Sequence, residues 1–140
     1  MTIRPKTRRW LLVLIAACVL TVSWVTVNRP GRFGLCRFGF TVYSCRPFIV
    51  SDVQIRADGA SRTVDKSHDL QMETLSWLLT PEPEILIIGT GWEGATEVAR
   101  AVRELPGVDV RILKSGAARD LYNRFRRTGK RVAIHYHATC

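Results

Sequence analysis

The chain of 140 residues is long enough for one small domain and too short for two. Hydrophobic residues make up 46% of it and charged residues 24%, which excludes a disordered or fibrous chain. The net charge of +9 is unevenly placed, because residues 1–50 carry basic side chains and no acidic one, whereas residues 51–140 are nearly balanced. This distribution argues against a nucleic-acid partner, which would require a basic folded domain.

Residues 1–9 form a basic tail, and residues 10–27 form an apolar run of 18 residues without a charge. As a helix, this run spans roughly 27 Å, close to the hydrocarbon thickness of a bilayer. Trp10 and Trp24 lie near its two ends, where amphipathic rings are favoured. We therefore predict one transmembrane helix and a lipid bilayer as partner. The flanking positive charges slightly favour a cytoplasmic tail and a domain outside the cytoplasm.

Two alternative roles for the apolar run remain open. A basic start followed by an apolar stretch is also typical of a cleaved signal peptide, although no small-x-small cleavage site follows the run. The segment Ile15-Ala16-Ala17-Cys18 resembles the motif at which bacterial lipoproteins are cut and acylated. Nine further, mostly apolar residues follow Cys18, and such a stretch is unsuitable as a lipoprotein tether.

The next segment, residues 28–34, contains Pro, Gly and Arg and is predicted to be a linker. The domain that follows begins with alternating patterns typical of antiparallel strands, with bends expected at Gly34 and Gly39. Ser67-His68-Asp69 supply capping oxygens for a helix with an inward row of leucines. The elements predicted in this half are strands over 33–43, 48–56 and 61–64, then a helix over 67–79.

In the second half of the domain, apolar residues follow a different pattern, in which strand and helix spacings alternate. Residues 84–88 form a short, continuously apolar segment, as expected for a strand that is covered on both faces. Apolar residues then recur at helical spacing over 95–105 and 118–125, and strand patterns occupy 108–113 and 130–136. Strand and helix thus alternate, which favours parallel pairing through right-handed crossovers. The predicted fold class is α/β with a mixed β-sheet: an antiparallel N-terminal part and a parallel βαβαβ C-terminal part.

The cysteines and histidines of this sequence do not form a recognisable catalytic or metal-binding motif. Cys36 and Cys45 are nine residues apart and could close a disulfide loop in an oxidising compartment, whereas in the cytoplasm they would be small core residues. His135, His137 and Cys140 form only a weak set of metal ligands. We therefore predict no metal, no cofactor and no catalytic residues.

The segment Gly89-Thr90-Gly91-Trp92-Glu93-Gly94 matches the G-x-G-x-x-G pattern of phosphate-binding loops. Trp92 and Glu93, however, place bulk and negative charge where a phosphate would lie. Too few residues follow the loop for a dinucleotide-binding fold. A tight turn that needs glycine is therefore the favoured interpretation, ahead of a bound anion or small ligand and of a dinucleotide.

Residues 52–135 resemble the Mth938-like domain family, which includes a mitochondrial complex I assembly factor. The resemblance rests on the runs Asp52-Val53-Gln54-Ile55 and Pro83 to Gly91, with Leu121-Tyr122-Asn123 and Gly129 to Ala133 further on. It departs from the family at Leu113-Lys114-Ser115, where Met-x-Thr is usual. The resemblance implies a three-layer mixed-sheet fold for residues 35–140 and implies no reaction.

Two groups of side chains are candidate functional residues. Open α/β sheets bind ligands at the carboxyl ends of their strands, where hydroxyl and amide groups of the first group are expected to gather. Alternatively these groups cap one another, with Ser115 capping a helix and Asn123 bonding a loop carbonyl. The second group is a basic stretch that is either a solvated face or a contact for anionic lipid or an acidic partner. The first group is Thr90, Gly91, Ser115, Tyr122 and Asn123; the second is Arg119, Arg124, Arg126, Arg127, Lys130 and Arg131.

These features together favour a membrane-anchored, non-enzymatic interaction or assembly module with a protein partner in the membrane. One alternative is a binder of small molecules or anions, or an enzyme, that uses the strand ends near Thr90, Ser115 and Tyr122. Another is an accessory structural subunit of a membrane complex.

Overall fold

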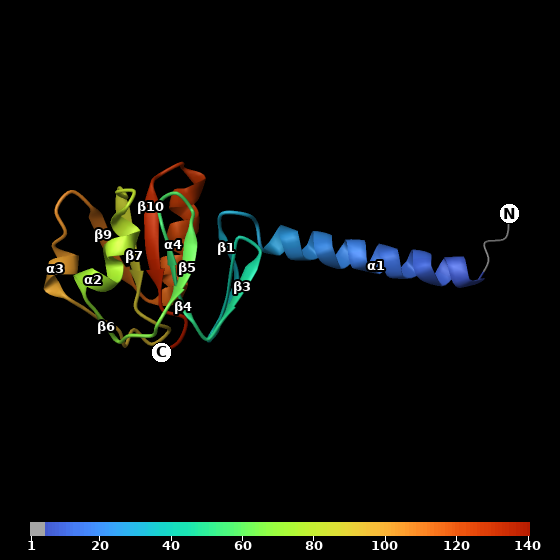
Figure 1. Cartoon of the computed structure of the whole chain (residues 1–140), viewed down its shortest axis with the longest axis horizontal. Coiled ribbons are helices and arrows are strands. Elements are labelled where there is room, and N and C mark those ends of the chain that lie inside the picture. The colour runs from blue at the N-terminus through green and yellow to red at the C-terminus, as the bar shows by residue number, and fades with distance from the viewer. Residues whose placement is uncertain (1–4) are drawn as a thin grey trace.

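The computed structural model describes residues 5–140, so residues 1–4 of the predicted basic tail lie outside it. A long helix, α1 (Pro5–Val27), projects from a folded head (Figure 1). Its segment Thr7–Val27 has a mean hydropathy of 2.4 in its most apolar part, and none of that part is buried by the protein. By length and composition this helix could cross a membrane, and a signal sequence would meet the same criteria.

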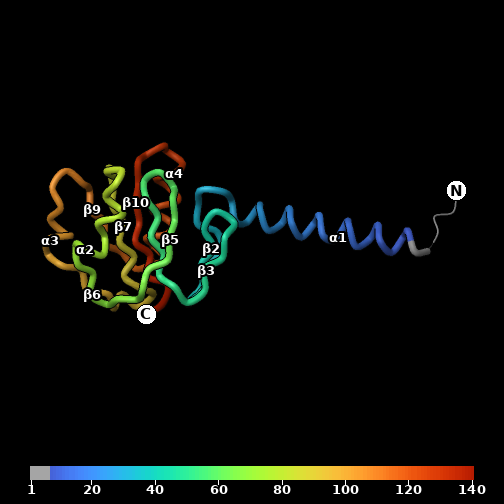
Figure 2. The backbone as a smooth tube through the Cα atoms, in the orientation of Figure 1, coloured from blue at the N-terminus to red at the C-terminus, as the bar shows by residue number. Residues whose placement is uncertain are grey.

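A small antiparallel sheet lies between α1 and the rest of the head (Figures 1 and 2). It consists of β1 (Phe33–Arg37), β2 (Phe40–Tyr43) and β3 (Arg46–Ile49), in that order. The prediction of one bent strand over 33–43 is wrong, because the chain reverses at Gly39, whose φ of 70° is accessible to glycine at little cost. We call this sheet the hairpin sheet.

The main sheet has five strands in the order β5-β4-β10-β7-β9. β10 and β9 pair with β7 in parallel, whereas β4 pairs antiparallel with β10 and with β5. This arrangement confirms the mixed sheet, antiparallel in its N-terminal part and parallel in its C-terminal part. The strands are β4 (Asp52–Ile55), β5 (Ser61–Val64), β7 (Ile85–Gly89), β9 (Asp109–Leu113) and β10 (Val132–Tyr136).

The main sheet is covered on both faces, which gives three layers. In β7, Ile85 and Ile87 face one core cluster while Leu86 and Ile88 face the other, so the continuous apolar run has the predicted explanation. The helix α4 (Ser115–Arg127) packs on the first cluster with Phe33 of the hairpin sheet. The second cluster lies under α2 (Met72–Leu75), the 3-10 helix η1 (Ser76–Leu79) and α3 (Arg100–Arg103).

Three further predicted elements are corrected. The helix over 67–79 begins only at Met72, and the helix over 95–105 is reduced to α3. The residues just before each of these helices instead form β6 (Asp69–Leu70) and β8 (Glu97–Val98), which pair in parallel. The strand over 48–56 is divided between β3 and β4, because the chain passes from one sheet to the other near Val50.

Candidate functional site

The predicted strand-end residues divide into two places. Thr90, Gly91 and Ser115 come together where β7 and β9 end. The Ser115 hydroxyl donates to the His137 carbonyl oxygen at 2.6 Å and accepts from the Gly91 N–H at 3.0 Å. The Thr90 hydroxyl donates to the Leu113 carbonyl oxygen at 3.2 Å. These polar groups therefore bond to one another and to backbone.

The predicted capping role of Ser115 is wrong. Ser115 is the first residue of α4, the N-cap position is Lys114, and no side chain caps this helix end. The Ser115 hydroxyl is instead fully buried and ties the end of β9 to residues that follow β10.

The glycine loop is a tight turn packed against the end of the chain. Gly91 has a φ of 98°, and a Cβ there would lie 2.5 Å from the carbonyl carbon and oxygen of Cys140. The Trp92 N–H donates to the Thr139 carbonyl oxygen at 2.7 Å. Protein backbone therefore occupies the space next to Gly91, and these contacts support the tight-turn interpretation.

Tyr122 and Asn123 lie away from these strand ends and hold the hairpin sheet on α4. Asn123 accepts the Phe33 N–H at 2.9 Å and donates to the Phe33 carbonyl oxygen at 2.8 Å. Its partner is thus a residue of strand β1 and not the loop carbonyl that was predicted. The Tyr122 hydroxyl lies 3.2 Å from that of Tyr43, and burial raises the pKa of both phenols. Both tyrosines therefore stay neutral and support packing.

A buried pair that was not predicted from the sequence lies beside the strand ends. His137 Nδ1 lies 2.6 Å from Asp52 Oδ2, with both side chains fully buried, and Asp52 Oδ1 accepts the Ala138 N–H at 3.1 Å. The exposed His68 ring contacts that of His137 at 5.2 Å between centroids. A carboxylate at the start of a strand and a histidine 85 residues later give no local sequence signal. With no exposed surface, this pair positions backbone and offers no reactive group to solvent.

A second buried histidine, His135, lies on the same side of the main sheet as His137, because alternate residues of β10 share a face. Gln54 Nε2 donates to the Thr74 carbonyl oxygen at 2.8 Å and lies 3.2 Å from His135 Nδ1, while Arg62 donates to Gln54 Oε1. His135 Nε2 is buried and has no hydrogen-bond partner among the described residues. Burial lowers the pKa of His135 to about 4, because the charged ring would lose its hydration.

The stability of the head should therefore depend on His135 at mildly acidic pH. The unfolded chain takes up this proton near pH 6.5 and the folded chain only near pH 4, so between these values unfolding binds one proton. The free energy of unfolding should fall as pH drops, by about 2 kcal/mol between pH 6.5 and 5. Urea denaturation of the full chain in detergent micelles measures it. His135→Leu should flatten this dependence, and an equally steep profile in that variant would contradict the assignment; His68→Gln, at an exposed ring, should leave it unchanged.

All cysteines among the described residues are free thiols. Cys36 pairs with Thr41 across the β1–β2 ladder, and burial raises the pKa of its thiol. Cys45 lies beyond the other end of that ladder, where its thiol donates to the Asn28 carbonyl oxygen at 2.6 Å. The structure therefore does not join the predicted disulfide pair. Within residues 5–140, no group of three His, Cys, Asp or Glu side chains could hold a metal ion.

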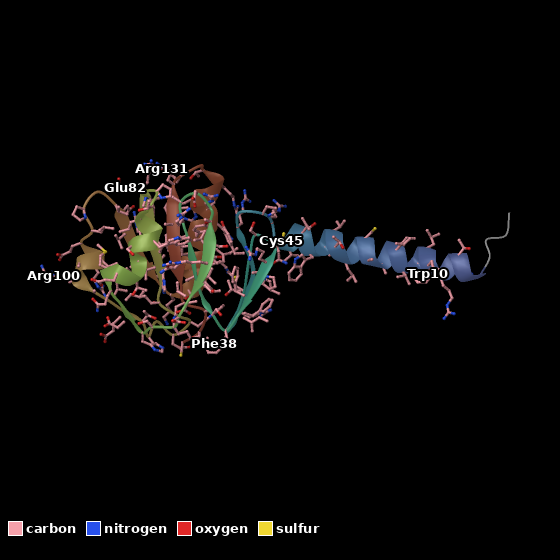
Figure 3. The ribbon with its side chains drawn as sticks, viewed as in Figure 1. Trp10, Phe38, Cys45, Glu82, Arg100 and Arg131 are labelled. Carbon is pink, nitrogen blue, oxygen red and sulfur yellow. The ribbon has the colours of Figure 1, made fainter. Side chains whose placement is uncertain are left out.

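The predicted linker is folded where it leaves α1. Asn28 is 1% exposed; its amide donates to the Trp24 carbonyl oxygen at 3.2 Å and its Oδ1 accepts the Leu35 N–H at 2.9 Å. The Trp24 indole donates to the Cys45 carbonyl oxygen at 3.3 Å, and Cys45 lies beside the end of α1 in Figure 3. Trp24 of α1 and Asn28 just after it are thus hydrogen-bonded to backbone of the hairpin sheet and of its β2–β3 turn. We call these contacts the junction.

Four of the six residues of the predicted basic stretch form ion pairs or hydrogen bonds. Arg119 pairs with Asp120, and Arg126 donates to the Ala57 carbonyl oxygen at 3.1 Å. Lys130 and Arg131 both pair with Glu84, whose pKa is lowered chiefly by the Arg131 backbone N–H. Of the basic side chains on α4, those of Arg124 and Arg127 are exposed.

An apolar patch is exposed at one end of the hairpin sheet. Phe38, Ile49 and Val50 expose 63%, 69% and 55% of their surfaces. The Val50 N–H donates to the Gly39 carbonyl oxygen at 2.7 Å, which brings the two turns together. We call these three residues the hairpin tip; Phe38 marks it in Figure 3.

The head has three layers, a mixed five-stranded sheet and an N-terminal hairpin sheet, and this architecture places it among the small α/β domains. The chain belongs to the family described as "Protein of unknown function (DUF498/DUF598)", whose model matches residues 36–137. This match excludes α1, and no curated protein matches.

Solved structures share this fold. MT938 is 34% identical, with a TM-score of 0.69 over 78% of this chain and 98% of that one, which confirms the Mth938-like resemblance. Conserved hypothetical protein PH1505 from Pyrococcus horikoshii OT3 is 22% identical, with a TM-score of 0.68 over 78% and 99% of the two chains. An outer membrane protein from Bartonella henselae is 20% identical, with a TM-score of 0.66 over 79% and 98%. The last two show likeness of fold alone.

Proposed function

We propose that the protein is a membrane-anchored, non-enzymatic interaction module, in which α1 crosses a bilayer and the junction fixes the head against the membrane. The junction is the observation that supports this most strongly. A leader that is removed needs no place in the mature fold, yet Trp24 and Asn28 contribute to the hydrogen bonding of the hairpin sheet. Cutting the chain after Val27 would leave the Asn28 amide without its Trp24 partner.

Exposure along α1 also supports a bilayer as its surroundings. Trp10, Leu14 and Leu20 are 62–70% exposed, and a row of such side chains in water would be strongly unfavourable. The Thr21 and Thr26 hydroxyls donate to the Ala17 and Val22 carbonyl oxygens of the preceding turn, so they need no water. A lipoprotein processed at Cys18 would lose half of this helix.

The hairpin tip is the surface proposed to contact a protein partner in the membrane. It belongs to the sheet that lies beside α1, so a partner within the same membrane can reach it. Three large apolar side chains close together exceed the scattered exposure usual on a soluble surface. At the strand ends, the Ser115 hydroxyl is already hydrogen-bonded to the Gly91 N–H and the His137 carbonyl oxygen. We therefore favour an interaction role for the protein over catalysis at the strand ends.

The experiment is co-purification of the tagged full chain from gently solubilised membranes. We expect a membrane protein in stoichiometric amount, and Ile49→Asp should reduce its recovery at least tenfold, because a charge in the apolar contact costs more than about 1.4 kcal/mol. Thr63→Asp, at an exposed site on β5, is the matched control and should retain the partner. Recovery of no stoichiometric partner, or equal recovery with Ile49→Asp, would refute the proposed role of the tip.

A further inference from the structure

Three arginines from two distant parts of the chain line a hollow at the end of α1. Arg29 and Arg32 follow the helix directly, and Arg127 comes from the last turn of α4. The hollow has a volume of about 230 Å³. Its other walls include Thr26, Val27 and Asn123.

The positive charge in this hollow is uncompensated. Across residues 5–140, the ion pairs formed by arginines involve other positions, such as Arg100 with Glu104 and Arg111 with Asp109. Arg29, Arg32 and Arg127 have no carboxylate at ion-pair distance within that range, and residues 1–50 contain no acidic residue. Like charges repel when they gather without a counter-ion, so an anion at this place would be stabilised.

The walls of the hollow are held in place by partly buried hydrogen bonds. Asn28 fixes the chain just before Arg29 through its bonds to Trp24 and Leu35. Asn123 ties α4 to β1 through both of its bonds to Phe33, four residues before Arg127 along the helix. Backbone that is fixed on both sides reduces the ordering cost of binding.

The hollow also lies at a defined depth relative to α1. Thr26 and Val27 are in the last turn of the helix, and its apolar run ends there. If α1 crosses a bilayer, as proposed above, the hollow lies at the level of the lipid headgroups. Guanidinium groups bind phosphate oxygens through paired N–H donors.

We propose that this hollow binds the phosphate of an anionic phospholipid headgroup in the leaflet where α1 ends. The inference rests on the proposed membrane crossing of α1. It adds a lipid preference that an apolar helix alone would not have. The two other sources of acidic groups, free phosphate and an acidic protein, are distinguished by the experiment.

The test reconstitutes the full chain into nanodiscs of phosphatidylcholine alone, or with one third phosphatidylglycerol. Incorporation into both kinds of disc reports on the membrane crossing; failure in both would refute that and leave no basis for the lipid site. Given incorporation, the anionic discs should raise the Tm of the head by roughly 3–6 °C through mass action. Adding inorganic phosphate to the neutral discs should give little of this shift.

Two triple variants provide the decisive comparison: one removes the three positive charges of the hollow, and the other removes three positive charges elsewhere on the head. Arg29→Gln, Arg32→Gln and Arg127→Gln together should abolish the lipid-dependent shift in Tm. The matched control removes Arg100, Arg111 and Lys130 in the same way; Arg100 lies at the opposite end of the head from α1 in Figure 3, and this variant should keep the shift. An equal Tm in both kinds of disc for the unaltered chain would overturn the proposal. An acidic protein would then be the remaining candidate ligand of the three arginines. A full shift with phosphate in neutral discs, or equal loss in the control, would also overturn the proposal.

Discussion

Asp52→Ala should lower the free energy of unfolding by about 3 kcal/mol, because it leaves two buried groups without a partner. The Asp52 carboxylate lies 2.6 Å from His137 Nδ1 and accepts the Ala138 N–H at 3.1 Å. Neither side chain is exposed, so water cannot replace the lost bonds. Urea denaturation of the full chain in micelles, followed by near-UV circular dichroism, measures this loss.

Two further variants separate hydrogen bonding from the mere loss of an acidic side chain. Asp52→Asn retains an oxygen for the Ala138 N–H and should recover more than half of the loss. Asp65→Ala, at an exposed aspartate, should change stability by no more than about 0.5 kcal/mol. A loss below about 1 kcal/mol for Asp52→Ala would contradict the view that this pair supports the fold.

Phe33→Ala should cost about 3–5 kcal/mol, because it empties the contact between the hairpin sheet and the main core. The Phe33 ring is 4% exposed, and its centroid lies 5.3 Å from Tyr43, 5.3 Å from Tyr122 and 5.0 Å from Tyr136. Loss of this ring should loosen β1–β3 before the main sheet unfolds. Limited proteolysis of the full chain should then cut the hairpin sheet first.

The matched control is Phe38→Ala, which removes the same ring from a position that is 63% exposed. It should leave urea denaturation and proteolysis close to those of the unaltered chain. If the two variants were equally stable, or if Phe33→Ala left the hairpin sheet resistant, the hairpin sheet would not depend on this contact. The junction would then be attached to the head by other means.

Elements with strong local patterns could be predicted from the sequence. Three such elements are the apolar run before Asn28, the continuously apolar β7 and α4 with its apolar stripe. In each of them the spacing of apolar residues within the element is sufficient to predict its type. β6 and β8 could not be predicted, because each has two residues and exists only through pairing with the other. The leucines before Thr80 and the alanine-rich segment after Gly94 have helical spacing, and distant backbone partners override it.

The same distinction applies to the candidate site. Thr90, Gly91 and Ser115 follow strand ends, so parallel topology brings them together as predicted. Tyr122 and Asn123 are one turn or more into α4, and the helix carries them away to the hairpin sheet. The Asp52–His137 pair and the arginine hollow join residues 85 and about 100 positions apart, which no local pattern reveals.

Retention of α1 in the mature protein is the central claim, and one measurement tests it most directly. Membranes from cells that make the full chain are washed with alkaline carbonate, and the intact mass of the protein is determined in pellet and supernatant. We predict an uncut chain in the pellet, with residues 10–27 present and Cys18 without lipid. A soluble chain that begins after Val27, or an acylated chain that begins at Cys18, would contradict the account.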